Sequence, residues 1–547
     1  MKNFNSNTLK ALRIDSLYLL IKPFSDIGKK TKRNFKVFRN GDESKAQDYF
    51  LHINNILKII NKFPETISYI GSTLSHFDDI SGILKHDTKR IFEMHELFEI
   101  KKFIYFYRIL IKQLKEKDLY NIIPFRSLDD LFFLLDIDKQ NSPSFYISTQ
   151  YSLKYKELKE KYTQLKYETD QEIQNLKTKI TNDLNLSVIE NTITISRMNQ
   201  ALINKLLDSK YFYIDKENFA NVILKIRLTE DIFYKQNLLN QLDNDLELEA
   251  RNIINEISQK INIQKDILAK AIEEVGTIDL LFAKAIFARN YHCCIPEIVQ
   301  RTQTNDIMLN CIDSYDIFLK NELHKLSIEY QAISISISNP VTVITGSNMG
   351  GKTSILKSIG QIAFMAQLGI PVPAKQAELV LFDNVFFSGP ITQEDRADLS
   401  SFGFEVFTLQ NVINSKGFNL FLLDEFGRGT NPHEGQALAQ SVMDYFSHQN
   451  KTILVTATHY TPSPTLQNFT HYQMKGLKQD FVKELNSENA NNLNSVLKIL
   501  HKYMDYQPIE VSKNNTVPKS ALYIAKILGL DKDIINKAEA ICKSKLH

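Results

Sequence analysis

Apolar residues follow two different patterns in the C-terminal part of the chain. Residues 332–338, AISISIS, alternate between apolar and polar positions, as in a β-strand that is buried on one side. Three other short runs are almost continuously apolar or β-branched, which suits strands buried on both faces of a sheet. Helical stretches separate these runs, and such alternation predicts a mainly parallel sheet. The three runs are residues 340–345, 419–425 and 452–458.

The middle of the chain shows a helical pattern instead. Between residues 158 and 180, apolar residues recur at intervals of three and four among many Lys, Glu and Gln residues, which predicts a long helix with a narrow apolar seam. Thr169 and Glu172 interrupt this seam. A second helical stretch is expected from about Phe219 to Val275. Two interpretations stay open, a projecting coiled-coil arm over about 150–275 or plain helix-bundle packing.

Glycine and proline divide the chain. Only five of the 18 glycines lie before residue 340, and no proline occurs between Pro143 and Pro296. Both residues disrupt helix interiors, whereas the turns of α/β folds need them. We therefore expect a multidomain protein, with an all-α region over residues 1–295 followed by an α/β domain over residues 296–547.

The composition gives only limited information on the partners and the cellular compartment of the protein. Lys and Arg total 66 and Asp and Glu total 63, so a nucleic-acid partner is neither required nor excluded, and any surface for one must be a local patch. The four cysteines include no CxxC pair and are interpreted as thiols in a reducing cytosol. The N-terminus lacks a signal-type apolar core and no run of 18 apolar residues occurs. We expect a cytoplasmic protein without a membrane partner.

One glycine-rich segment carries a specific chemistry. Residues 346–353 fit the pattern GxxxxGK[ST], between a predicted strand and a predicted helix. Glycines without a Cβ let such a loop turn tightly and point backbone N–H groups at phosphate oxygens, and the start of the helix adds partial positive charge. Lys352 would then reach the β- and γ-phosphates of a nucleotide, and Thr353 would hold Mg²⁺. The rest of the loop is Gly346, Ser347, Asn348, Met349, Gly350 and Gly351.

Two further strands end in polar residues that suit this chemistry. The apolar run 420–423 ends in Asp424, which is placed to support Mg²⁺, and Glu425, which could polarise the attacking water. Another strand ends in His459, at the sheet edge where α/β proteins bind ligands. We expect His459 to contact the γ-phosphate or its water. The C-terminal domain is therefore predicted to be an α/β P-loop NTPase domain.

Together these segments resemble the MutS family of ATPases, within the ABC class. The family's TGPNMGGKST is similar to the segment TGSNMGGKTS here, with Ser347 in place of the proline. The resemblance implies an ABC-type domain that binds ATP and Mg²⁺. The similar segments are residues 278–285, 345–354, 369–374, 423–435, 457–460 and 520–530.

The resemblance also implies a dimer, expected here to be a homodimer, with two composite ATP sites. Ser354 is also expected to contact ATP. Ser400 or Ser401 of the partner subunit would complete each site. Asp398 and Leu399 stand where the family carries a glycine and a polar residue before its serine.

Two functions follow from the resemblance. The first is an ATP-dependent protein of the MutS type that opens and closes a helical clamp on double-stranded or branched DNA. Because no counterpart of the family's mismatch-reading domain is recognised, direct mismatch recognition is not expected. Residues 29–36 and 154–179 are basic enough to support DNA binding, although Glu residues also interleave with the lysines, as on an ordinary solvated helix face. The alternative is an ATPase that remodels a protein partner, such as a cobalamin-dependent aminomutase.

Overall fold

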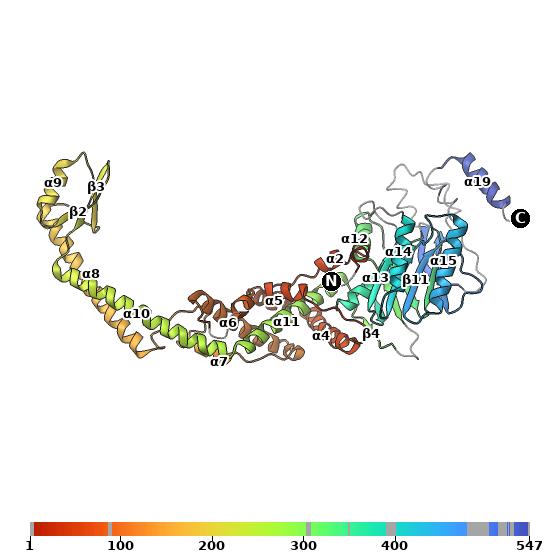
Figure 1. The fold of residues 1–547 in the computed structure, drawn as a ribbon, viewed down its shortest axis with the longest axis horizontal. Helices are drawn as coiled ribbons and strands as arrows, with labels where there is room; N and C mark the ends of the chain where they lie inside the picture. The colour runs from red at the N-terminus through yellow and green to blue at the C-terminus, as the bar shows by residue number, and fades with distance from the viewer. Residues whose placement is uncertain are drawn as a thin grey trace. The chain divides into compact units, whose positions relative to one another are not determined.

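The structure of the 547-residue chain is a computed structural model (Figure 1). It forms two compact units. The larger unit comprises residues 1–75, 113–124 and 273–547, and the smaller comprises residues 76–112 and 125–272. The residues that the structure describes are 5–85, 90–301, 308–347, 350–389, 401–477, 503–511, 522, 525 and 530–544.

The larger unit contains a six-stranded sheet with the strand order β13-β12-β7-β11-β10-β9. Five of the strands run parallel, and β13 is antiparallel to β12. Every residue of β7, β10 and β11 is buried, as their apolar and β-branched sequences predict. The mainly parallel sheet and its three buried strands are thus confirmed. The strands are β7 (Val341–Thr345), β9 (Asn384–Ser388), β10 (Asn419–Asp424), β11 (Thr452–Thr458), β12 (Phe469–Leu477) and β13 (Met504–Glu510).

Helices cover both faces of this sheet. Phe421 and Leu423 of β10 pack in one cluster with apolar residues of α14 and α15. Leu422 points to the opposite face, where its Cδ1 lies 2.7 Å from the place that a Cβ on Gly360 of α13 would take. Consecutive strand residues alternate between the faces, so α13 packs opposite α14 and α15. The helices are α13 (Lys352–Gln367), α14 (Ser401–Ile413) and α15 (Pro432–Ser447).

A second sheet of the larger unit has the order β4-β8-β5-β6. The predicted alternating strand is confirmed as β6, in which buried and half-buried residues alternate. The elements are β4 (Glu297–Ile298), β5 (Leu309–Ser314), α12 (Ile317–Lys325), β6 (Ile333–Ile337) and β8 (Gln376–Leu379), with α19 (Lys532–Ser544) near the C-terminus.

The N-terminal helices belong to the same compact unit as these sheets. Thr8, for example, accepts a hydrogen bond of 3.2 Å through its hydroxyl oxygen from the backbone N–H of Phe387 on β9. The predicted division of the chain at residue 295 stays a prediction. The N-terminal elements are α1 (Ser6–Ala11), α2 (Ile14–Leu19), α3 (Asp26–Arg33), α4 (Glu43–Lys62), α5 (Thr66–Leu74) and the 3₁₀ helix η2 (Tyr120–Ile122).

Two long helices dominate the smaller unit. The helix predicted between residues 158 and 180 is confirmed as α8 (Leu153–Leu184), which packs against α10 (Glu230–Ile263). The two polar interruptions of its seam have partners: Thr169 donates to the backbone oxygen of Leu165, and Glu172 accepts from Lys235 of α10 at 2.6 Å. Shorter helices of this unit include η1 (Ile80–Lys85) and α7 (Asp129–Leu135).

A small antiparallel sheet in the smaller unit corrects the prediction that residues 1–295 are all-α. The order is β1-β3-β2, and the sheet packs with Ile180 of α8 and Ile203 of α9. The second helical stretch was placed too early, at Phe219, because Val222, Leu224 and Ile226 alternate inward from a strand. The elements are β1 (Thr192–Ser196), α9 (Gln200–Asp208), β2 (Phe212–Glu217) and β3 (Asn221–Ile226).

Two helices, α6 (Met94–Glu116) and α11 (Lys265–Tyr291), contribute residues to both units. Across the described ranges, no helix combines the length and the apolar character that a membrane crossing requires.

Candidate functional site

The glycine loop joins β7 to α13, as the pattern predicted. Gly346 and Gly351 adopt φ angles of 149° and 87°, a region that favours glycine. A Cβ on Gly346 would lie 2.8 Å from the Cβ of Met474 on β12, and one on Gly351 would lie 3.1 Å from the ring of Tyr506 on β13. Glycine is therefore required both by the backbone turn and by the close neighbours. Asn348 and Met349 lie outside the described residues.

Lys352 is buried at the first position of α13, with 3% of its side chain exposed. Its Nζ donates to the backbone oxygens of Gly346 at 2.8 Å and Ser347 at 3.2 Å, so the amine lies inside the curve of the loop. Burial lowers the pKa of Lys352, while the nearby carboxylates Glu425 and Asp424 oppose that shift.

Thr353 and Asp424 meet across the space between α13 and β10. The Thr353 hydroxyl donates to Asp424 Oδ2 at 2.7 Å. The other oxygen, Asp424 Oδ1, is buried and has no hydrogen-bond partner among the described residues. Burial raises the pKa of Asp424, and the hydrogen bond from Thr353 opposes this shift.

These two residues fit a magnesium ion. Mg²⁺ prefers hard oxygen ligands and is usually held by one or two protein groups together with phosphate oxygens. A free carboxylate oxygen beside a hydroxyl supplies such groups. In the described part of the chain, no cluster of three or more His, Cys, Asp or Glu residues is placed to hold a metal.

Glu425 is surrounded by cationic or hydrogen-bonding side chains. Its Oε1 lies 2.8 Å from His459 Nε2 and 3.6 Å from Lys352 Nζ, and its Oε2 pairs with Arg428. Burial acts to raise the pKa of Glu425, but His459, Lys352 and Arg428 outweigh burial and the net pKa is lowered. The carboxylate is therefore held ionised within reach of the loop.

The backbone helps to aim this carboxylate. Glu425 has a left-handed φ of 53°, and its N–H donates to the backbone oxygen of Ala457 at 2.8 Å. The ends of β10 and β11 are thereby joined where Glu425 and His459 leave the sheet. His459 Nε2 also lies 3.3 Å from Lys352 Nζ, so it stands between the lysine and the glutamate.

The start of α14 is connected to the segment after β10. Gly427 has a φ of 80° and donates its N–H to Glu405 Oε2 at 3.1 Å. A Cβ on Gly427 would lie 2.9 Å from the backbone oxygen of Gly435, at the beginning of α15. Burial raises the pKa of Glu405, and the hydrogen bond from Gly427 opposes this shift.

Among the predicted site residues, the structure brings together the side chains of five: Lys352, Thr353, Asp424, Glu425 and His459. Ser354 is half-buried in the first turn of α13. Ser401 begins α14, but Ser400 lies outside the described residues, so the structure leaves their predicted role untested.

Sequence reasoning missed four neighbours of the site. Arg428 lies in the similar segment 423–435 and Glu405 follows the predicted serines, but nothing in the sequence showed their pairing with Glu425 and Gly427. Met474 and Tyr506 lie more than a hundred residues after the loop, and no local pattern links them to it.

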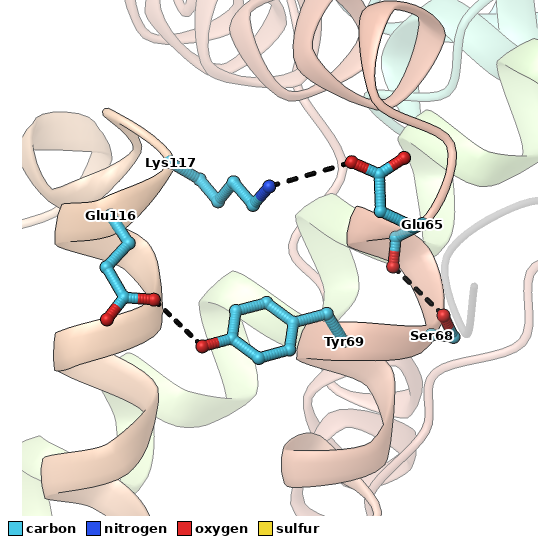
Figure 2. A pocket seen from close by; sticks show the side chains of 5 residues that line it. All are labelled: Glu65, Ser68, Tyr69, Glu116 and Lys117. Atoms are coloured by element: carbon cyan, nitrogen blue, oxygen red, sulfur yellow. Dashed lines mark hydrogen bonds and ion pairs between the residues drawn. The ribbon is translucent and has the colours of Figure 1, made fainter.

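A separate hollow of about 540 Å³ lies in the larger unit, between α5 and the end of α6 (Figure 2). Its polar side chains pair mainly with each other: Tyr69 donates to Glu116 at 2.8 Å, and Lys117 lies 3.7 Å from Glu65. None of the predicted site residues lines it.

Comparison with known proteins relates the sequence around this site to a protein family. The family model described as MutS domain V matches residues 342–545, which include the glycine loop, Asp424, Glu425 and His459. Residues 342–545 therefore match the MutS family, and the chain is similar over longer stretches to proteins of that family.

Relatives in this family match over different lengths. The chain is 26% identical over 574 residues to an endonuclease MutS2 of Caldanaerobacter subterraneus, covering 99% of this chain and 64% of that protein. It is 30% identical over 313 residues to an endonuclease MutS2 of Staphylococcus epidermidis, covering 56% of this chain and 35% of that protein. It is 27% identical over 355 residues to a DNA mismatch repair protein MutS of Streptococcus suis, covering 62% and 38%. The chain thus spans less than two thirds of the length of these relatives.

Proposed function

We propose that this chain is a MutS-type protein that binds ATP with Mg²⁺ in the loop 346–353 and hydrolyses it to ADP and phosphate. The observation that carries the proposal is the contact between Thr353 and Asp424, which leaves a buried carboxylate oxygen free beside the loop. Neither a structural hydrogen bond nor a packing role requires that free oxygen, whereas a metal–phosphate group does.

Each side chain has a place in this chemistry. The Lys352 amine would leave the backbone oxygens of the loop and bind the β- and γ-phosphates. Asp424 and Thr353 would hold Mg²⁺, which when bound neutralises charge on the phosphates. Glu425, kept ionised, would orient the attacking water, and His459 beside it would donate to the γ-phosphate or to that water.

The predicted composite site extends this proposal to a dimer. Ser400 or Ser401 of the partner subunit would complete each site, together with Ser354 of the subunit that holds the nucleotide. Within each subunit, the bond between Glu405 and Gly427 connects the start of α14 to the segment that follows Glu425. An ABC-type ATPase domain over residues 296–547 is part of the same proposal.

DNA is the proposed partner of the protein. The relatives compared above are named as endonucleases MutS2 and as a DNA mismatch repair protein. Lys29 and Arg33 are exposed on α3, although Lys29 also pairs with Asp26 at 2.8 Å. No observation in the structure favours the alternative of a protein partner such as an aminomutase.

The test is an ATPase assay in which duplex, mismatched and four-way-junction DNA are titrated in. We expect Mg²⁺-dependent hydrolysis that at least one of these DNAs stimulates, with binding that weakens as salt rises. No hydrolysis under any condition would contradict the ATPase proposal. If the protein hydrolyses ATP but none of the DNAs binds to it or changes the rate, the DNA proposal alone would be contradicted.

A further inference from the structure

The segment 278–285 of α11, which the sequence analysis singled out, carries two buried ionisable residues. Asp279 and Lys284 are both 0% exposed, and the other residues of the segment 278–285 are apolar. They lie five positions apart, so they point to different neighbours around the helix. Burying such groups is unfavourable unless specific partners compensate. The partners of Asp279 and Lys284 therefore show which neighbouring segments are fixed to α11.

Asp279 fixes the turn before α3. Its carboxylate accepts from the backbone N–H groups of Phe24 at 2.9 Å and Ser25 at 2.8 Å, and from the Ser25 hydroxyl at 2.6 Å. Gly28 of α3 packs so closely that a Cβ there would lie 2.1 Å from Asp279 Oδ2. This contact anchors α11 to the N-terminal helices.

Lys284 has a different partner, the end of the helix that begins at the glycine loop. Its Nζ donates to the backbone oxygen of Leu368 at 2.7 Å and lies 3.1 Å from the hydroxyl of Tyr49. The rings of Phe35 and Tyr49 lie over Nζ, with centroids at 3.7 and 4.6 Å. Among the described residues, no carboxylate forms an ion pair with Lys284.

Leu368 is the C-cap of α13, whose first residue is Lys352. The chain just after it is closely held: Gly369, with a φ of 63°, packs against Tyr49 and Phe38, and the N–H of Phe38 donates to Gln367 at 2.8 Å. A 16-residue helix moves largely as one body, so a displacement at the loop reaches this end.

We propose that Lys284 is a positioning residue through which α13, and hence nucleotide at the glycine loop, acts on α11. An apolar side chain would fill the same space between the rings without the cost of burying an amine, but it could slide against α13. A directional hydrogen bond to the Leu368 carbonyl instead makes α11 follow α13. The inference rests on the proposed binding of ATP.

The experiment is hydrogen–deuterium exchange of the full chain with and without AMP-PNP and Mg²⁺, read in peptides from residues 278–288. AMP-PNP should change the exchange rate there about threefold or more in the unmodified protein, while Lys284→Met should show less than about half of that change. The affinity of the Lys284→Met variant for AMP-PNP, measured by calorimetry, should stay within about threefold of that of the unmodified protein. Circular dichroism verifies that the variant is folded.

Asp279→Asn is the matched control. It alters the contact of α11 with α3 but leaves the bond to Leu368, so the response to AMP-PNP should persist. Tyr49→Phe, which removes only a hydroxyl near Nζ, should weaken the response and serves if Lys284→Met does not fold.

The outcomes are distinct. If the unmodified protein binds AMP-PNP but residues 278–288 do not respond, or if Lys284→Met responds as fully as the unmodified protein, the inference is wrong and the proposed ATP site stands. If the unmodified protein binds no AMP-PNP, both are wrong.

Discussion

Thr353 donates its hydroxyl hydrogen to Asp424 at 2.7 Å, although 71 positions separate the two residues in the sequence. The contact joins the first turn of α13 to the end of β10 and leaves Asp424 Oδ1 without a partner among the described residues. This pair is the part of the structure most directly related to a metal–nucleotide complex.

Thr353→Ala and Asp424→Asn should each lower Mg²⁺-dependent ATP hydrolysis by about a hundredfold or more, because each removes an oxygen ligand or its charge. Thr353→Ser keeps the hydroxyl and is the matched control. Initial rates measured over a series of Mg²⁺ concentrations test this expectation. Rates for the alanine variant equal to those of the serine variant would remove Thr353 from the site.

Glu425→Gln should separate binding from chemistry. The amide keeps the shape of the side chain beside His459 but loses its basicity, so hydrolysis should fall by about 10²–10⁴-fold. ATP affinity, followed with a fluorescent ATP analogue, should change by less than about threefold. A variant that hydrolyses ATP at the unmodified rate would show that another group orients the water.

Lys284 should make stability depend on pH. Burial lowers the pKa of Lys284 well below the ordinary value, whereas in the unfolded chain the amine keeps its proton up to about pH 10.4. Between these two pKa values unfolding takes up a proton, so stability rises with pH by up to about 1.4 kcal/mol per unit.

Lys284→Met lacks this group and serves as the reference. Urea unfolding at pH 7, 8 and 9 should show the unmodified protein gaining stability relative to the variant as pH rises. Parallel curves for the two proteins would indicate that Lys284 has the same pKa in both states.

Two ion pairs of the smaller unit should differ strongly in importance. Lys101 and Asp136 pair at 2.8 Å with 4% of each side chain exposed, whereas Arg197 and Glu217 pair at 2.7 Å with about half of each exposed. Lys101→Met should cost about 3–5 kcal/mol of unfolding free energy, because it leaves a buried carboxylate uncompensated.

Arg197→Met should cost less than about 1 kcal/mol. Denaturant unfolding of both variants, followed by circular dichroism, makes the comparison. Equal losses would mean that Asp136 finds another partner or becomes protonated without penalty.

The buried strands and the glycine loop could be predicted because their signal is local. The runs at 340–345 and 419–425 are mostly apolar or β-branched, and a strand that ends in glycines before a helix has few other structural solutions. The convergence of Lys352, Asp424 and His459 then followed from the rule that parallel strands bring their carboxyl ends to one edge.

The small sheet was missed for an opposite reason. Five of the six residues of β2 are exposed, so its sequence carries little burial pattern. The alternation of β3 is clear, but it is short and directly precedes the long helix α10, which dominated the interpretation.

The long-range partners had no sequence signal at all. Tyr506 covers Gly351, and Lys284 caps the end of α13, through contacts between segments more than 80 positions apart. Only the folded chain shows that the buried lysine of residues 278–285 faces a backbone oxygen and not a carboxylate.

Calorimetric titration of ATP with Mg²⁺ into the unmodified protein and into Lys352→Ala tests the central claim most directly. We predict saturable binding to the unmodified protein and a loss of about a hundredfold or more in affinity for the variant, because the phosphates lose their buried cation. Equal affinity in both proteins, or no binding to either, would contradict the assignment of the glycine loop as the nucleotide site.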